Sequence, residues 1–453
     1  MNSNRRVFRF VAYSVGLLLI LSLADLFFGF GWMPLQRVNL LSDIVSEKQI
    51  PVEPSAPTDT VSAPTMLIDS IAAEDFTLYE RPRQITNFKT DTSRPSLERF
   101  VQKLHALRTG EKIKVRIAYF GDSMIEGDLL TQTLRKLLQE QFGGQGVGFV
   151  PITSTVSQFR QTVGALYSSG WEDEHFKSGQ SRFLYLSGHL FRSDQDGEWV
   201  KLVDRTITDS LAIIEKSLLC GQSAKPQRIL VEGKPFTLEA GNTVNRIPLK
   251  VDQTRSLRID IASPQLPVYG CSFESEYGVF VDNFSFRCIT GIEFARIDSA
   301  FLASIAENNP YDLIVFQYGV NLLFRPNDMN FNWYARALEP VIRKMRNCFP
   351  VSDFLLVSTA DRAFRYGQEY KSAVGIDSLV KLQAALAYSS GASFYNQFAR
   401  MGGTNAVVDW AKQKPSLGNQ DYVHPNHRGA EVLAKYFYEA IMTDYNKYVS
   451  NLK

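Results

Sequence analysis

A strand, a Gly-Asp-Ser turn and an amphipathic helix follow one another in the sequence, and this unit constrains the fold most. Residues 113–120 read as a buried strand. The turn is Gly121-Asp122-Ser123. The helix after it carries leucines on one face at positions 130, 134, 137 and 138. Ser123 is therefore expected at the carboxyl end of a strand, where open α/β sheets bind ligands, and it is a candidate nucleophile.

The later part of the chain repeats the same alternation of strands and helices. Apolar runs at 313–316 and 354–357 are typical of buried strands, and helices are predicted near 334–347 and 375–389. A last amphipathic helix is predicted from about 429 to 441. Strands that alternate with helices indicate an α/β fold, in which helices cover both faces of a parallel sheet.

The middle of the chain has a different texture, because short β-rich runs separated by polar turns replace the helices. These runs lie at 182–186, 199–202 and 257–261. Such spacing favours a β-sandwich, which we expect as an insertion over 151–277. The α/β domain is then split into a first part, 93–150, and a second part, 278–453.

The amino terminus predicts a membrane anchor. Residues 10–31 are nearly all apolar and long enough to cross a bilayer. Arginines in 1–9 favour a cytoplasmic amino end, so we expect a single-pass anchor in the inner (cytoplasmic) membrane with the catalytic domain on the periplasmic or extracytoplasmic side. A cleaved signal peptide is the alternative, although no small-x-small site follows. The Pro-, Ser- and Thr-containing residues 32–92 are predicted to be a flexible linker.

The composition excludes several classes of function. A net charge of +2 over 453 residues, without a basic stripe, argues against nucleic acid as a partner. Four cysteines without Cys-x-x-Cys spacing and only five histidines do not form a metal-site pattern, so no metal or organic cofactor is expected. A disulfide between Cys271 and Cys288 remains open.

Three further segments supply partners for Ser123. Asp421 and His424 lie three apart just before the last helix, so they can meet Ser123 at the same sheet edge. His424 would then take the proton of the serine, and Asp421 would orient the imidazole. Asn321 follows the strand 313–316, and its carboxamide can donate to a developing oxyanion. A backbone N–H near the end of 278–291 can provide another donor.

These four blocks, in this order, resemble the SGNH or GDSL hydrolase superfamily over about 93–150 and 278–445. The resemblance implies a flavodoxin-like three-layer fold, a Ser123–His424–Asp421 triad and an oxyanion hole that includes Asn321. The chain departs from the family at the glycine block. Relatives read Arg-Gly-x-Ser-Gly where this chain has Arg287-Cys288-Ile289-Thr290-Gly291, so either Cys288 or Gly291 is the oxyanion donor.

A narrower resemblance is to the cell-wall branch of this superfamily. It rests on the helix end at 137–143 with the glycines that follow, and on Met401-Gly402-Gly403 and Trp410 ahead of the Asp-His block. That branch contains peptidoglycan O-acetylesterases with an inserted carbohydrate-binding-like β-sandwich. The resemblance implies a serine esterase that removes O-acetyl groups from an envelope polysaccharide, with acetylated cell-wall glycan as substrate.

Two alternatives remain open from the sequence. An O-acetyltransferase would pass the same acyl group to a glycan, with a multi-pass acyltransferase as partner, and a polysaccharide-binding protein would have an idle site. Single residues also allow structural interpretations. Ser123 suits a helix N-cap, Trp171 and Trp199 can pack in a core, and Asp361 with Arg362 is expected to be a surface or structural pair.

Overall fold

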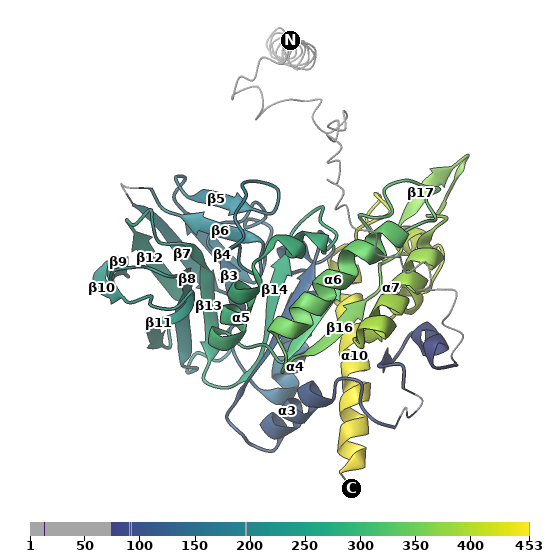
Figure 1. Cartoon of the computed structure of the whole chain (residues 1–453), viewed down its shortest axis with the longest axis horizontal. Coiled ribbons are helices and arrows are strands. Elements are labelled where there is room, and N and C mark those ends of the chain that lie inside the picture. The colour runs from purple at the N-terminus through teal and green to yellow at the C-terminus, as the bar shows by residue number, and fades with distance from the viewer. Residues whose placement is uncertain (1–12, 14–73, 90, 92, 195–196, 453) are drawn as a thin grey trace, which may run out of the picture. The chain divides into compact units, whose positions relative to one another are not determined.

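The computed structural model describes residues 13, 74–89, 91, 93–194 and 197–452, which form an α/β domain interrupted by a β-sandwich (Figure 1). The expected anchor at 10–31, apart from Tyr13, and most of the expected linker lie outside the described residues. Within the described part of the chain, no helix has the length and apolar character that a membrane span requires.

The α/β domain is built on a six-stranded sheet in the order β1-β19-β16-β15-β2-β14. The strands are β1 (Ile85–Thr86), β2 (Lys114–Gly121), β14 (Gly278–Ser285), β15 (Leu313–Gln317), β16 (Asp353–Val357) and β19 (Ser393–Tyr395). All neighbours are parallel except β1, which pairs antiparallel with β19 at one edge. The predicted parallel α/β sheet is confirmed.

Helices cover both faces of this sheet (Figure 1). Those on one face are α3 (Glu98–Arg108), α4 (Thr131–Phe142) and α10 (His427–Asn451), and those on the other are α5 (Ser299–Asn308), α6 (Asn332–Cys348) and α7 (Ile376–Ser390). Alternate residues of β2 point to opposite faces of the sheet. Ile117 and Tyr119 pack against the layer of α3, α4 and α10, whereas Ala118 and Phe120 pack against the layer of α5, α6 and α7. Burial on both faces explains why this strand is almost continuously apolar.

The inserted sandwich contains two antiparallel sheets, β10-β9-β12-β7-β4 and β11-β8-β13-β6-β5, with β3 added beside β13. Its strands are β3 (Gly148–Pro151), β4 (Val163–Tyr167), β5 (Glu172–His175), β6 (His189–Arg192), β7 (Glu198–Asp204), β8 (Ile214–Gly221), β9 (Gln227–Val231), β10 (Lys234–Leu238), β11 (Val244–Asp252), β12 (Ser256–Ile261) and β13 (Val268–Ser275). Because β3 pairs with β13, the sandwich begins before the expected boundary at 151.

Two other expectations need correction. The run 182–186 forms no strand; Leu184, Tyr185 and Leu186 are instead buried against the core of the α/β domain. The expected linker 32–92 is also too long. Its residues from Glu74 onward form a 3-10 helix, η1 (Glu74–Glu80), and β1, because Phe76 and Phe88 pack edge-on against Tyr388 of α7.

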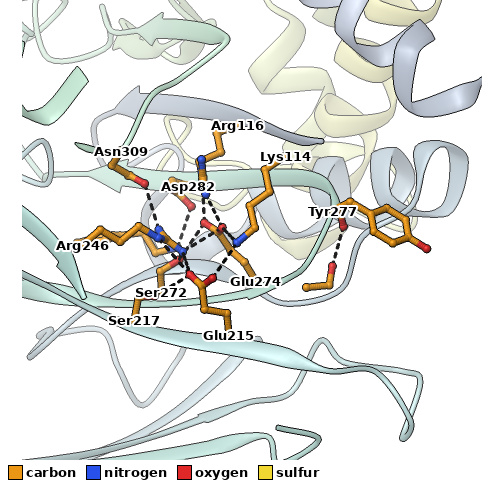
Figure 2. A network of polar contacts seen from close by, with 12 residues as sticks. Lys114, Arg116, Glu215, Ser217, Arg246, Ser272, Glu274, Tyr277, Asp282 and Asn309 are labelled. Carbon is orange, nitrogen blue, oxygen red and sulfur yellow. Dashed lines mark hydrogen bonds and ion pairs between the residues drawn. The ribbon is translucent and has the colours of Figure 1, made fainter. Parts of the chain in front are cut away.

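A buried polar network joins the sandwich to the sheet (Figure 2). Glu274 of β13 is fully buried and accepts hydrogen bonds from Arg116 of β2 at 3.0 and 2.7 Å. The ammonium of Lys114 lies 3.1 Å from Glu274, and the guanidinium of Arg246 on β11 lies 3.0 Å from it. Burial alone would raise the pKa of Glu274, but these cations hold it well below its usual range. The carboxylate therefore neutralises cations from both parts of the molecule.

Candidate active site

The structure brings Ser123, His424 and Asp421 together at the carboxyl edge of the sheet. Ser123 lies in the turn between β2 and the 3-10 helix η2 (Glu126–Asp128). Its Oγ is 2.9 Å from His424 Nε2, and His424 Nδ1 is 2.7 Å from Asp421 Oδ2. This is the spacing of a nucleophile, a general base and an orienting carboxylate. The two ends of the triad are separated by about three hundred residues in the sequence.

The loop that carries Asp421 and His424 is held by contacts of its own. Asp421 Oδ1 accepts hydrogen bonds from the N–H groups of Val423 and His424 at 3.0 and 3.1 Å. Tyr422 has a φ of 56°, and its ring stacks on Tyr370 with centroids 4.2 Å apart. Tyr370 belongs to a hairpin of β17 (Ala363–Tyr366) and β18 (Glu369–Ser372). This hairpin therefore supports the loop that carries Asp421 and His424.

The electrostatics of the loop keep Asp421 ionised. Partial burial would raise its pKa, but hydrogen bonds from His424 and from the two backbone N–H groups lower the pKa to about 2. With the carboxylate accepting the Nδ1 proton, a neutral His424 presents the lone pair of Nε2 to the hydroxyl of Ser123. The arrangement is suited to taking the serine proton.

Two backbone donors are free near the nucleophile. Among the described residues, the N–H groups of Ser123 and Cys288 have no hydrogen-bond acceptor. By contrast, the N–H of Thr290 donates a hydrogen bond to the carboxylate of Glu293 at 3.1 Å. Cys288, one of the two donors left open by the sequence, therefore has an available N–H. The hydrogen bond from Phe286 N to Gly121 O, 3.0 Å, ties this segment to the serine turn.

Cys288 occupies a backbone conformation that favours glycine. Its φ is 58°, and its side chain is exposed. Cys288 and Cys271 are both free thiols, so the disulfide left open by the sequence is not formed. A glycine would adopt this left-handed conformation without strain, and the chain tolerates a cysteine there at a cost of roughly 1–2 kcal/mol.

Replacing Cys288 separates the role of its backbone from that of its side chain. Cys288→Gly is expected to retain or exceed the wild-type kcat/KM for a small acetyl ester, because glycine adopts the positive φ without strain. Cys288→Val is expected to lower kcat/KM about tenfold, because a β-branched residue disfavours this φ and shifts the N–H. Steady-state kinetics measure both. An inactive glycine variant would show that the thiol itself is required.

Asn321 lies in the turn after β15, and its side chain links the serine turn to the segment that contains Cys288. Its Nδ2 donates to Asp122 Oδ2 at 3.2 Å and to the carbonyl of Ile289 at 2.9 Å. Both amide hydrogens are thus engaged. The structure places Asn321 beside the serine turn and the Cys288 segment, and donation to an oxyanion requires exchange of one of these contacts.

Asp122, next to the nucleophile, is completely buried. Its Oδ1 accepts a hydrogen bond from the N–H of Met124 at 2.9 Å, while Oδ2 receives that of Asn321. Burial raises the pKa of Asp122 to about 7, against the opposing effects of the Met124 hydrogen bond and of His424. Asp122 therefore shapes the turn and holds Asn321, and it titrates near neutral pH.

The raised pKa of Asp122 predicts a dependence of stability on pH. In the unfolded chain this carboxyl ionises near pH 4, whereas in the folded protein it keeps its proton up to about pH 7. The contribution of the protonated Asp122 carboxyl to the free energy of unfolding is therefore complete below pH 4 and is lost as pH rises through 7. Asp122→Asn is expected to be about 4 kcal/mol more stable relative to wild type at pH 8 than at pH 4. Urea unfolding at both pH values checks this; an equal difference at both would contradict it.

Asp128, which no local sequence pattern singles out, fixes the loop after the serine. Asp128 is buried with a φ of 67° and binds Arg135 of α4 through two hydrogen bonds of 2.8 and 2.9 Å. It also accepts from Arg160 at 3.3 Å and Thr162 at 2.6 Å, both on the sandwich side. An arginine at 135 on the apolar face of a helix was the signal that a buried acid must lie nearby.

Asp361 and Arg362 form no surface pair. Asp361 is fully buried and accepts from Ser372 Oγ at 2.6 Å and from the N–H of Val407 at 3.0 Å. Arg362 donates to the carbonyl of Val320 at 2.8 Å, next to Asn321. Their role is structural, and Arg362 holds the turn that carries Asn321.

A pocket of about 240 Å³ opens at Ser123 and His424. Its far wall is formed by Val156 and Phe159, which belong to the irregular segment between β3 and β4 of the sandwich. Within the described ranges, no group of three or more His, Cys, Asp or Glu residues is placed to hold a metal ion. The pocket thus combines a serine nucleophile with a wall supplied by the insert.

The fold of this chain is shared with a solved structure of the kind that the sequence resembles. Among solved structures, the chain is similar to a peptidoglycan O-acetylesterase, with a TM-score of 0.68 and 19% identity over 80% of this chain and 99% of that one. This coverage exceeds the α/β domain alone, so the shared fold extends into the insert. The predicted resemblance is confirmed at the level of the fold.

Two further solved structures are only weakly similar to the chain. Family two carbohydrate esterases from Cellvibrio japonicus and Clostridium thermocellum both align with a TM-score of 0.27, at 8% and 11% identity. They cover 63% of this chain and 99% and 100% of their own, but a TM-score this low does not indicate a shared fold. No protein-family model matches the chain, and no curated protein sequence matches it.

Proposed function

We propose that this protein is a serine esterase that removes O-acetyl groups from a cell-envelope polysaccharide such as peptidoglycan. The observation that carries the proposal is the hydrogen-bonded series Ser123–His424–Asp421, with distances of 2.9 and 2.7 Å, at the edge of the sheet. The fold shared with a peptidoglycan O-acetylesterase supports the choice of substrate.

The geometry allows acylation in two proton transfers through one imidazole. Ser123 Oγ attacks the acetyl carbonyl carbon while its proton passes to His424 Nε2. Negative charge develops on the carbonyl oxygen, and the free N–H groups of Ser123 and Cys288 are the donors available to stabilise it. His424 then gives its proton to the sugar oxygen as the ester C–O bond breaks, which leaves an acetyl group on Ser123.

Deacylation reverses these roles with water as the nucleophile. His424 takes a proton from water, the resulting hydroxide attacks the acetyl carbonyl, and the proton returns to Ser123 as acetate leaves. Asp421 stabilises the imidazolium in both halves of the reaction. Asn321 can join the oxyanion donors if its 3.2 Å contact with Asp122 gives way to the shorter, charge-assisted bond to the oxyanion.

The test is acetate release from O-acetylated peptidoglycan by the purified protein, with and without an added unacetylated chito-oligosaccharide. The proposal predicts free acetate in both cases. Acetyl transfer to the added oligosaccharide faster than to water would establish the O-acetyltransferase alternative instead. Binding of the glycan without loss of acetyl groups would establish a polysaccharide-binding protein with an idle site.

We further propose that the enzyme acts outside the cytoplasmic membrane, anchored by residues 10–31. The apolar stretch and the arginines that precede it support this orientation. The test is protease treatment of spheroplasts that produce the full chain. Degradation of the catalytic domain without lysis is the expected result, and protection until lysis would overturn the orientation.

A further inference from the structure

A second and larger pocket adjoins the pocket at Ser123. It has a volume of about 430 Å³ and shares Glu126, Gly127 and Val156 with the smaller one. One side comes from η2 and the end of β14, and the other from β4, β5, β6 and neighbouring loops of the sandwich. A chain molecule held at Ser123 can therefore continue into this space.

Ser187 is the first sign that the larger pocket binds something. It lines the pocket and is 5% exposed, yet its hydroxyl has no hydrogen-bond partner within the described structure. A buried polar group without a partner destabilises a protein, and such groups are rare in folded chains. A ligand hydroxyl in the pocket would satisfy it.

Two histidines of the sandwich add a matched pair of polar groups. Their rings lie 5.6 Å apart and both line the pocket. His189 Nδ1 is 2.8 Å from Asp173, so in its neutral form the ring leaves Nε2 as an acceptor. His175 Nδ1 accepts from the N–H of Lys177 at 3.2 Å, so a neutral ring leaves Nε2–H as a donor. A donor beside an acceptor suits a sugar hydroxyl, which is both.

Aromatic rings form part of the pocket wall, beside several charged and hydroxyl side chains. Phe286 packs against both histidine rings, with centroids 5.7 and 5.0 Å away. Trp171 lines the same pocket, with its indole N–H bonded to the carbonyl of Trp199 at 3.1 Å, while Trp199 is not among the lining residues. Apolar rings with a few convergent polar groups are typical of small-molecule sites, and a pyranose has one apolar C–H face and a polar rim.

We propose that this pocket is a second sugar subsite, which binds another ring of the same polysaccharide whose acetyl ester lies at Ser123. The inference rests on the proposed esterase function and extends it from a single acetylated sugar to an oligosaccharide. The insert then selects chain length by holding sugars next to the reacting one, so that binding energy far from the ester positions it at the serine.

The test uses chemically O-acetylated N-acetylglucosamine oligomers from the monosaccharide to the hexasaccharide. For the wild type, kcat/KM is expected to rise about tenfold or more with chain length, the effect of one or two hydrogen bonds. The ratio of hexasaccharide to monosaccharide kcat/KM is expected to fall about tenfold in His175→Ala and in Ser187→Ala. Ser390→Ala, which removes another buried serine hydroxyl on α7, is the control and keeps the wild-type ratio.

The outcomes separate the subsite from the esterase. A wild type that cleaves all lengths equally well, or variants that lose activity equally on all lengths, overturn the subsite and leave the esterase intact. A wild type that cleaves none of the esters overturns the proposed function itself. Ser187→Ala is also expected to unfold at the same temperature as wild type or higher, because its hydroxyl has no partner. A clear fall in that temperature would assign the hydroxyl a structural role and contradict the subsite.

Discussion

Ser123→Ala is expected to lower kcat/KM for a small acetyl ester by on the order of 10⁴- to 10⁶-fold. The Oγ is the atom that forms the covalent intermediate, and without it His424 Nε2, 2.9 Å away in the wild type, has no serine hydroxyl to activate. The residual rate would come from binding and from the N–H donors near Ser123 and Cys288, which remain in the variant. Initial rates with the purified variant, after removal of trace wild-type enzyme, measure the loss.

The fold should survive this change. Ser123 lies in a turn and packs in no core cluster of the described residues, so circular dichroism and the unfolding temperature are expected to match those of the wild type. His424→Ala is the matched test of the base and is expected to cause a loss of similar size, because the two residues act as a unit. An active, folded Ser123→Ala protein would overturn the assignment of the nucleophile.

Glu274→Gln is expected to lower the free energy of unfolding by about 3–5 kcal/mol at pH 7. The substitution leaves Arg116, Lys114 and Arg246 as neighbouring cations around a neutral amide (Figure 2). Since Glu274 is fully buried, solvent cannot replace the lost carboxylate. Urea unfolding of the two proteins, followed by tryptophan fluorescence, measures the difference.

The pH dependence of this effect has a definite sign. The pKa of Glu274 is depressed in the folded protein, so its contribution is present above the unfolded value of about 4.3 and is lost as pH falls further. The difference in the free energy of unfolding between wild type and variant should therefore become smaller in strong acid. Glu431→Gln, which breaks an exposed pair with Lys435 on α10, is the control and should unfold like the wild type. An equally stable Glu274→Gln would contradict the role of the network.

The sequence predicted that Ser123, Asp421 and His424 come together because each belongs to a short local pattern. A serine after a buried strand and an Asp-x-x-His before the last helix are visible without knowledge of the tertiary structure, and the α/β sheet brings them to one edge. The hydrogen bond from Asn321 to Asp122 could not be predicted from the sequence, because it depends on how two turns from distant strands pack.

Several errors at the boundaries share one physical cause. Residues 182–186 have a strand-like apolar pattern, but they bury Leu184 and Tyr185 against the α/β core instead of pairing in a sheet. The stretch 74–89 reads as linker because it is mostly polar, yet Phe76 and Phe88 suffice to dock it. Long-range packing overrode local composition in both places. It also placed Asp128 beside Arg160, a contact between separate segments that no local pattern reveals.

If Ser123 carries the acyl group between sugar and acceptor, the reaction passes through an acetyl ester on its Oγ. The most direct test is to mix the enzyme with an activated acetyl ester, quench with acid within the first turnover, and map the acetyl group by peptide mass spectrometry. We expect one acetyl group on Ser123 in the wild type, and none in Ser123→Ala treated in the same way. Ester hydrolysis by a wild type that carries no acetyl group on Ser123, or acetylation that persists in the variant, would contradict it.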